Sequence, residues 1–299
     1  MRIKGKVAWL DVVKPTKTDI ETIKRLHQFH PIILDELLEP SARSRVEPHD
    51  SYIFLVYHLP MFDHELKTSR RGEVDFLITR DKVITVHYEP LEPLEQFRRE
   101  LERDETLRSR ALRNTAILVY RLIQDIVNFS LRQMRHMEDN IEYVSHGIFN
   151  GREEEMLRKI SYLKRDILDY SIISEPQGIT LDSLLEVGES FWGKSSRIYF
   201  TDLIGDYTKM IQRLRNSKEV IESLEMTNAQ LLTAKTNKVI QRFTVLAFVT
   251  FPVLFIVFLL QIDALRDALG GLSALFAGLL FSAALALLIV AVFRRKGWL

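Results

Sequence analysis

Two long uncharged runs near the C-terminal end constrain this chain more than any other feature. Phe243–Leu260 and Leu272–Phe293 contain no charged residue, and the first run continues without charge to Ile262. Each run has roughly the 17–25 residues that a helix needs to cross the hydrocarbon core of a bilayer. Two segments cannot close a barrel, so only helices satisfy their backbone hydrogen bonds there. The sequence therefore predicts membrane spans at residues 243–262 and 272–293.

Charged residues around these spans predict their orientation. Lys235, Lys238 and Arg242 precede the first span, Arg294–Lys296 follow the second, and the link Asp263–Gly271 carries two Asp and one Arg. The positive-inside rule then places both ends of the hairpin in the cytoplasm. We expect a multi-pass protein of the cell (inner) membrane, with the bilayer as one partner and cytoplasmic N- and C-termini. A very hydrophobic hairpin in a soluble protein is the alternative.

Composition excludes several classes of function. The 299 residues include 41 basic and 40 acidic side chains and no cysteine. Residues 239–299 hold five basic and two acidic side chains, so the remaining chain is slightly acidic, which argues against nucleic acid as a partner. Cysteine-ligated metals and thiol catalysis are excluded. Because no Walker loop, His-Glu-x-x-His or G-x-S-x-G motif occurs, nothing supports an enzyme.

The N-terminal residues 1–110 predict a small cytoplasmic α/β domain. Runs of β-branched and aromatic residues predict strands at residues 6–13, 52–59, 73–79 and 82–88. Thr18 and Glu21 have the spacing of a capping box, which predicts a helix start. His27 and His30 are interpreted as packing or capping groups, because two ligands do not make a metal site.

Long helices are predicted from residue 111 onward. Asn114 is a candidate N-cap for a helix to residue 148, and a second helix is expected over residues 153–173, so residues 111–198 form a helical domain. Residues 199–242 form a long stalk helix with an apolar seam at alternating spacings of four and three. Its members are Leu203, Tyr207, Met210, Leu214, Ser217, Ile221, Leu224, Asn228 and Leu231. This seam predicts a multi-subunit stalk, with a coiled coil used only for tethering as the alternative.

Several short segments, in order and with matching spacing over nearly the full length, resemble the CorA family of magnesium transporters, the two-span GxN type. The matching segments are Trp9–Pro15, His30–Glu36, Arg45–Glu47, Tyr199–Asp202, Thr236–Val239, Phe251–Pro252 and Lys296–Leu299. The resemblance implies a homopentameric funnel with an α/β N-terminal cytoplasmic domain, long helices and a C-terminal two-helix transmembrane hairpin in residues 243–299. It also implies a channel for divalent cations, Mg²⁺ in the first place, lined by the first span. Zinc is the weakest of the ions considered, because the pore helix has no His or Cys.

One face of the first-span helix is the candidate pore wall. It comprises Asn237, Ile240, Thr244, Ala247, Phe251, Leu254 and Phe258. Mg²⁺ loses its water reluctantly, so a pore that passes the hydrated ion needs rings of oxygen atoms. Asn237 and Thr244 meet that need, whereas Phe251 and Phe258 predict a dewetted constriction.

The outer mouth departs from the family pattern. The family's Gly-Met-Asn signature is replaced at the aligned positions by Gln261, Ile262 and Asp263. Asp263 from several copies would form a ring of negative charge that concentrates cations, or it is simply a hydrated carboxylate at a helix end. Gln261 would bond hydration water or cap the span. The departure leaves a second function open, a non-conducting membrane-anchored sensor or interaction module.

The resemblance also implies regulatory divalent cations bound between subunits in the cytoplasm. The matching carboxylates are Glu36, with Asp35 beside it, and Asp202. Hard cations such as Mg²⁺ prefer such oxygen ligands. The alternative is that these carboxylates are surface or interface groups paired with arginine.

Overall fold

A computed structural model describes residues 2–261 and 272–296. The chain divides into two compact units, residues 1–225 and 226–299, and each is described by itself below. The α/β part and the helical part expected from the sequence lie in the same first unit.

The first unit is built around a mixed six-stranded sheet with the order β1-β2-β6-β5-β4-β3. Its strands are β1 Arg2–Lys4, β2 Ala8–Val13, β3 Arg45–Pro48, β4 Tyr52–Asp63, β5 Thr68–Thr79 and β6 Lys82–His87. Among the described strands, only the β2–β6 pair is parallel, and the turn between Thr79 and Lys82 joins β5 to β6 as an antiparallel hairpin. The four strands predicted from β-branched and aromatic runs are therefore present, with β4 and β5 longer than expected.

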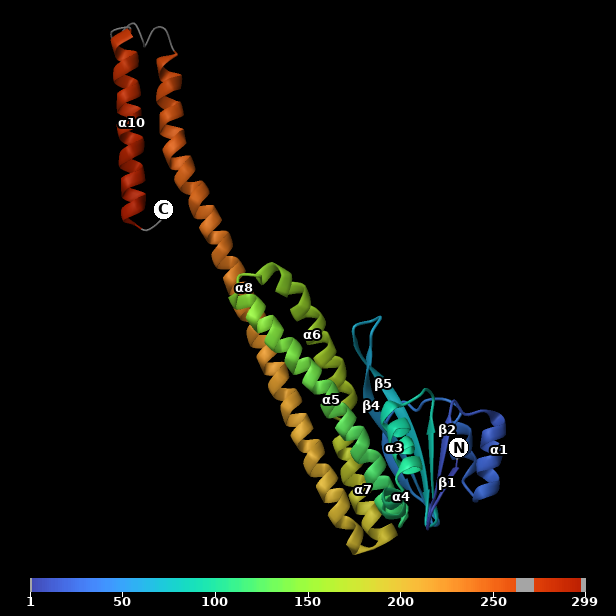
Figure 1. Cartoon of the computed structure of the whole chain (residues 1–299). Helices are drawn as coiled ribbons and strands as arrows, with labels where there is room; N and C mark the ends of the chain where they lie inside the picture. The colour runs from blue at the N-terminus through green and yellow to red at the C-terminus, as the bar shows by residue number, and fades with distance from the viewer. Residues whose placement is uncertain (1, 262–271, 297–299) are drawn as a thin grey trace. The chain divides into compact units, whose positions relative to one another are not determined.

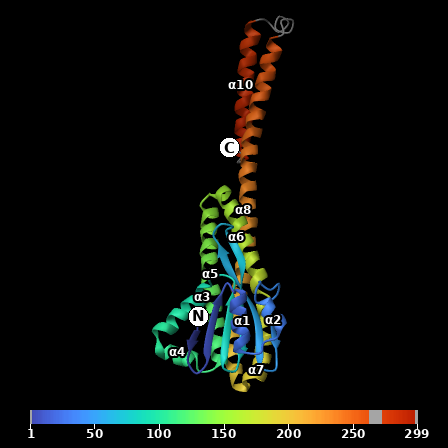
Figure 2. The same ribbon diagram turned by 90° about the vertical axis from the view of Figure 1, so that its right-hand side faces the viewer.

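Helices cover both faces of the sheet, so the central strands are buried on both sides (Figure 1). The two short helices α1 Lys17–Leu26 and α2 Pro31–Glu36 pack on one face, where Ile23, Leu34 and Leu37 meet Phe54, Val56 and Leu77. Figure 2 shows α1 in front of this face. The other face contacts the long helices, which is why β4 is an almost continuous apolar run rather than an alternating one.

The remaining helices of the first unit are α3 Glu92–Arg103, α4 Glu105–Ala111, α5 Thr115–Phe149, α6 Glu153–Ser174, α7 Gln177–Trp192, a 3₁₀ turn at Lys194–Ser196, and the first part of α8 Arg197–Leu260. The Asn114 side chain accepts a hydrogen bond from the Ile117 amide, so the predicted N-cap of α5 is confirmed. His30 caps α2 in the same way, accepting from the Ile32 amide.

One local prediction was wrong. The capping box of α1 uses Thr16 and Asp19, whose side chains bond reciprocally to each other's backbone amides, rather than Thr18 and Glu21. The helix begins earlier because an Asp at the third helical position can replace the usual Glu. Pro176 lies between α6 and α7, at the N-cap position of α7, where its fixed φ is compatible with a helix start.

The apolar seam of α8 is buried within its own chain over its first part, which corrects the expectation that the seam requires other subunits there. Leu203, Leu214 and Ile221 are buried, and Tyr207 donates a hydrogen bond to the Ser174 carbonyl of α6 at 2.7 Å. Tyr170 of α6 reaches the sulfur of Met210, also on the seam. The long helices α5 and α6 supply a packing surface that the sequence reasoning did not assign to α8.

A series of hydrogen bonds joins buried polar side chains of β2 and β6. Trp9 Nε1 donates to Thr85 Oγ1 at 2.9 Å, and Thr85 donates to Asp11 Oδ1 at 2.6 Å. His87, which is fully buried, contacts the same Asp11 oxygen at 3.1 Å and the Glu89 carbonyl at 2.6 Å. Asp11 and His87 therefore form a buried hydrogen-bonded pair that links β2 to β6.

The second unit contains the last part of α8 and α10 Leu272–Arg295, which run antiparallel side by side (Figure 1). The rings of Phe248 and Phe293 contact each other with centroids 5.9 Å apart. Both helices are long and apolar enough to cross a membrane. Most of their large apolar side chains are exposed, so this unit has almost no core of its own.

Candidate functional site

The seven residues predicted to line a pore share one face of α8. At 100° per residue they fall within an arc of roughly 100°. The larger members of this face are exposed, with Phe251 at 71% and Phe258 at 62% of their full accessible area. Val245, which is buried, lies outside the arc. The structure thus brings these side chains together as one uncovered stripe along the helix.

The polar members of the stripe offer oxygen atoms. Thr244 donates its hydroxyl hydrogen to the Ile240 carbonyl one turn earlier at 2.9 Å. Its oxygen therefore faces outward only as an acceptor, which suits a cation or the water around it. Asn237 is exposed two turns below. The apolar members above Thr244, among them Phe251 and Phe258, offer no such ligand.

At the predicted outer mouth, Gln261 is exposed and its backbone amide donates to the Phe258 carbonyl at 3.1 Å, which ends α8. Ile262 and Asp263 lie outside the described residues.

The predicted regulatory carboxylate Glu36 lies at the C-terminal end of α2, half-buried and already paired. Arg45 of β3 donates to both of its oxygens at 2.7 Å, and the Ser41 hydroxyl donates to Oε1 at 3.0 Å. Asp35 beside it is exposed. The arrangement joins α2, the following loop and the edge strand β3 around a single carboxylate.

Asp202 lies on the first part of α8, also exposed. Tyr120 of α5 donates a hydrogen bond to Asp202 Oδ2 at 2.8 Å. Burial and this hydrogen bond raise the pKa of Tyr120 to about 12, because an ionised phenol beside a carboxylate is unfavourable. A shallow groove of about 680 Å³ runs past Asp202, Thr201 and Asp206.

A single chain does not bring the predicted metal ligands together. Glu36 lies on the face of the sheet covered by α1 and α2, whereas Asp202 lies among the helices on the other face. Among the described residues, no three His, Asp or Glu side chains are placed to hold a metal ion.

Sequence reasoning missed a cluster of buried polar groups next to Glu36. Glu73 accepts from the Ser41 amide at 2.7 Å, and His58 Nε2 lies 3.0 Å from its other oxygen. Two residues further along β5, Asp75 is fully buried, and burial, together with the nearby Glu73, raises its pKa well above the usual range. The alternation of Glu73 and Asp75 with apolar residues was the only available signal, because it places both carboxylates on the buried α1–α2 face.

Asp75 has a geometric reason to hold a proton. The Tyr88 hydroxyl lies 2.9 Å from Asp75 Oδ2 and 2.9 Å from the Glu39 carbonyl oxygen. A hydroxyl has one hydrogen and a carbonyl can only accept, so a protonated Asp75 that donates to Tyr88 satisfies both contacts. These hydrogen bonds connect β5 to the segment that follows α2.

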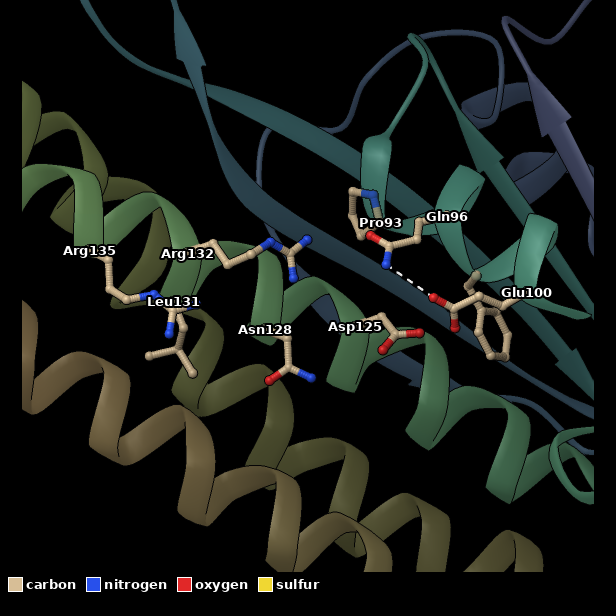
Figure 3. A pocket seen from close by; sticks show the side chains of 9 residues that line it. Pro93, Gln96, Glu100, Asp125, Asn128, Leu131, Arg132 and Arg135 are labelled. Carbon is tan, nitrogen blue, oxygen red and sulfur yellow. Dashed lines mark hydrogen bonds between the residues drawn. The ribbon is translucent and has the colours of Figure 1, made fainter. Parts of the chain in front are cut away.

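A polar cavity of about 370 Å³ is lined by residues of α3 and α5, which also contact each other (Figure 3). Asp125 of α5 points toward Glu100 of α3, which accepts a hydrogen bond from Gln96 at 3.0 Å. Burial, and then repulsion by Glu100, raises the pKa of Asp125 to about 6, against the weaker opposing effect of Arg121 and Arg132. The cavity therefore contains a carboxylate that titrates close to neutral pH, which the sequence did not indicate.

The chain matches a family model described as "CorA-like Mg2+ transporter protein" over residues 4–295. The chain belongs to the CorA family. This is a family of membrane transport proteins and not of enzymes, as the sequence predicted. The cobalt/magnesium transport protein CorA of Thermotoga maritima is 21% identical over 257 residues, which cover 83% of this chain and 70% of that protein.

Solved structures show the same fold. The complete structure of the CorA magnesium transporter from Methanocaldococcus jannaschii superposes with a TM-score of 0.84 at 18% identity, covering 98% of this chain and 92% of that one. The full-length CmaX protein gives a TM-score of 0.70 at 16% identity, covering 98% and 89%. The predicted order of an α/β part, long helices and a C-terminal pair of apolar helices is confirmed.

Proposed function

We propose that this protein moves divalent cations, Mg²⁺ in the first place, across the cell membrane through a pore made by several copies of α8, five by analogy with the family. Membership of a family of Mg²⁺ transporters carries the proposal. The exposed stripe from Asn237 to Phe258 supports it, because α10 leaves this face of α8 uncovered. Asn237 and Thr244 would contact hydrated ions, and Gln261 and Asp263 would lie at the outer mouth.

The topology we propose follows the charges. We place both termini in the cytoplasm, because Lys and Arg side chains precede the first span and follow the second, whereas the link between the spans has a net negative charge. The cation then enters a cell whose interior is electrically negative, which favours inward movement.

Regulation would use the cytoplasmic carboxylates. A Mg²⁺ ion shared by Asp35 and Glu36 of one copy and Asp202 of the next would hold subunits together, and its loss would loosen them. The placement of these groups on opposite sides of the sheet supports a site between copies, because one chain cannot assemble it. Asp202→Asn should then reduce the inhibition of uptake by internal Mg²⁺, with Glu219→Gln, at an exposed position of the same helix outside the groove, as the matched control.

A second candidate is a non-conducting sensor or interaction module with the same scaffold. The exposed phenyl groups of Phe251 and Phe258 favour it, since five copies of each would form an apolar constriction. It differs from the first candidate in one measurable respect. Phe251→Ala with Phe258→Ala would create flux in a sealed pore but only modify flux in a working one.

The deciding experiment is ion uptake by full-length protein in liposomes containing a Mg²⁺-sensitive dye. Wild-type protein should take up Mg²⁺, and Asn237→Ala should lower the rate by about ten-fold, on the scale of losing one hydrogen bond to the hydrated ion. Absence of uptake of Mg²⁺, Co²⁺, Ni²⁺ and Zn²⁺ with both low and high internal Mg²⁺ would refute transport.

Two threonines provide a matched control for the pore face. Thr244 and Thr250 each donate to the carbonyl four residues earlier at 2.9 Å, and Thr250 also approaches the Ala247 carbonyl at 3.4 Å, so their local bonding is similar. Only Thr244 lies within the proposed pore face. Thr244→Ala should therefore change uptake while Thr250→Ala leaves it near the wild-type rate.

A further inference from the structure

The described part of the second unit carries positive charge only. Residues 226–261 and 272–296 contain six basic side chains and neither Asp nor Glu. The six are Lys235, Lys238, Arg242, Arg294, Arg295 and Lys296. Like charges repel, so an arrangement of this kind needs anions from outside these segments.

Five of these cations gather at one end of the helix pair. Contact between Phe248 and Phe293 fixes the level at which the antiparallel helices α8 and α10 meet (Figure 1). At 1.5 Å per residue, Arg294–Lys296 begin about 1.5 Å beyond Phe293, and Arg242 lies about 9 Å from Phe248 in the same direction. Lys238 follows one turn further. We name these five exposed residues, Lys238, Arg242, Arg294, Arg295 and Lys296, the basic collar.

An apolar belt begins directly beside the basic collar. The large exposed side chains of this belt on the two helices include Phe243, Leu246, Phe248, Leu288 and Val292. The change from cationic to apolar surface therefore takes place within about one helical turn. A ligand that satisfies both surfaces carries an anionic group joined to a long apolar chain, which a soluble anion or an acidic peptide does not provide.

We propose that the basic collar is a binding site for anionic phospholipids, with the headgroup phosphate held by the collar and the acyl chains on the adjacent apolar belt. Arginine suits this role because its planar guanidinium donates two parallel hydrogen bonds to a phosphate. Lys238 lies one helical turn further from the apolar belt than Arg242, and its long aliphatic side chain lets the ammonium reach the headgroup layer.

The size of the effect follows from the charge count. Each basic side chain close to an anionic membrane surface contributes roughly a five-fold preference over a neutral surface. Removing the three charges at Arg294, Arg295 and Lys296 should therefore lower the preference for anionic lipid by at least about ten-fold.

The test measures lipid retention by native mass spectrometry of the full-length protein in mixed micelles. Phosphatidylglycerol and phosphatidylcholine with identical acyl chains are supplied in equal amounts. Wild-type protein should retain phosphatidylglycerol preferentially, and the preference should fall as salt is raised. The variant R294Q/R295Q/K296Q should lose it, whereas R294K/R295K, which keeps the charge, should largely retain it.

A matched control removes three exposed cations from α1 in the first unit, as K17Q/K24Q/R25Q, and should leave the lipid preference unchanged. Glycerol 3-phosphate in excess should not displace the lipid. Equal retention of the two lipids by the wild type, the same loss in the α1 control, or displacement by glycerol 3-phosphate would each overturn the proposal. Since the readout is lipid binding, the result is independent of whether the protein transports ions.

Discussion

The two units of this chain use apolar residues in opposite ways. In the first unit, Leu77, Ile84 and their neighbours are buried between a sheet and its covering helices, and buried polar groups such as Asp11 are hydrogen-bonded to others in that interior. In the second unit, large residues such as Leu280 and Phe251 are exposed. The first unit therefore buries its own core, whereas the second depends on what surrounds it, lipid or other copies of the same helices.

This contrast has a thermodynamic meaning. Burial of a Leu side chain from water stabilises a fold by roughly 1.5–3 kcal/mol, but no such gain exists for a side chain that stays in contact with lipid. The same apolar substitution should therefore lower the free energy of unfolding more in the first unit than in the second. Substitution of a buried charged residue in the first unit should also lower it.

The largest effect is expected for Asp11→Asn, which removes the buried carboxylate that bonds to Thr85 and His87. Removing one partner of a buried, charged hydrogen-bonded pair costs about 3–5 kcal/mol. Burial opposes ionisation of Asp11, but hydrogen bonds from His87 and Thr85 outweigh it and hold its pKa below the usual range. Its contribution is thus present above about pH 4 and is lost as the solution becomes more acidic. Chemical denaturation of the full-length protein in detergent at pH 7 measures the loss, and equal stability of variant and wild type would contradict the assignment.

A leucine pair tests the comparison between units directly. Leu77→Ala should destabilise the first unit by about 2–5 kcal/mol, since it opens a cavity in a fully buried site. Leu280→Ala removes the same atoms from a side chain that is 73% exposed, and it should change that unfolding transition by less than about 0.5 kcal/mol. Similar losses in both variants would show that the second unit has a core of its own.

An intermediate effect is expected at the cavity between α3 and α5. Because the pKa of Asp125 is raised to about 6, its neutral form is favoured in the folded state, and the associated stability is lost as pH rises from about 4 through about 6. Asp125→Asn should therefore stabilise the protein by about 1–2 kcal/mol at pH 7.5 and have little effect at pH 4. The exposed Asp139 on the same helix provides the control, and Asp139→Asn should show no such pH dependence.

The smallest effect is expected at the contact between α5 and α8. Tyr120→Phe removes one hydrogen bond to the exposed Asp202 and should cost about 0.5–1.5 kcal/mol in thermal unfolding. Tyr162→Phe is the control, because Tyr162 is also exposed and its ring contact with Lys67 needs no hydroxyl. A larger loss in the control would indicate that the Tyr120 bond does not join the two helices.

Local sequence rules predicted much of the fold. Asn114 caps α5 as expected, and the strands follow β-branched and aromatic runs, because both depend on residues close in sequence. The start of α1 was misplaced by two residues because two overlapping Thr–acid pairs compete there.

The candidate site was predictable only where it lies on one element. The stripe from Asn237 to Phe258 follows from helical periodicity alone. By contrast, the pairing of Glu36 with Arg45, of Asp202 with Tyr120 and of Glu73 with His58 joins residues from different elements. No spacing in the sequence reports such contacts. The buried seam of α8 was assigned to other subunits for the same reason, since its partners lie on α5 and α6.

The guanidinium of Arg45 would weaken the binding of any metal ion at Glu36. Both carboxylate oxygens are already engaged by a fixed positive charge, so an arriving dication has to share or displace it. That competition lowers affinity and speeds release. The proposed regulatory site would therefore fill only at high ion concentration and would empty quickly when that concentration falls.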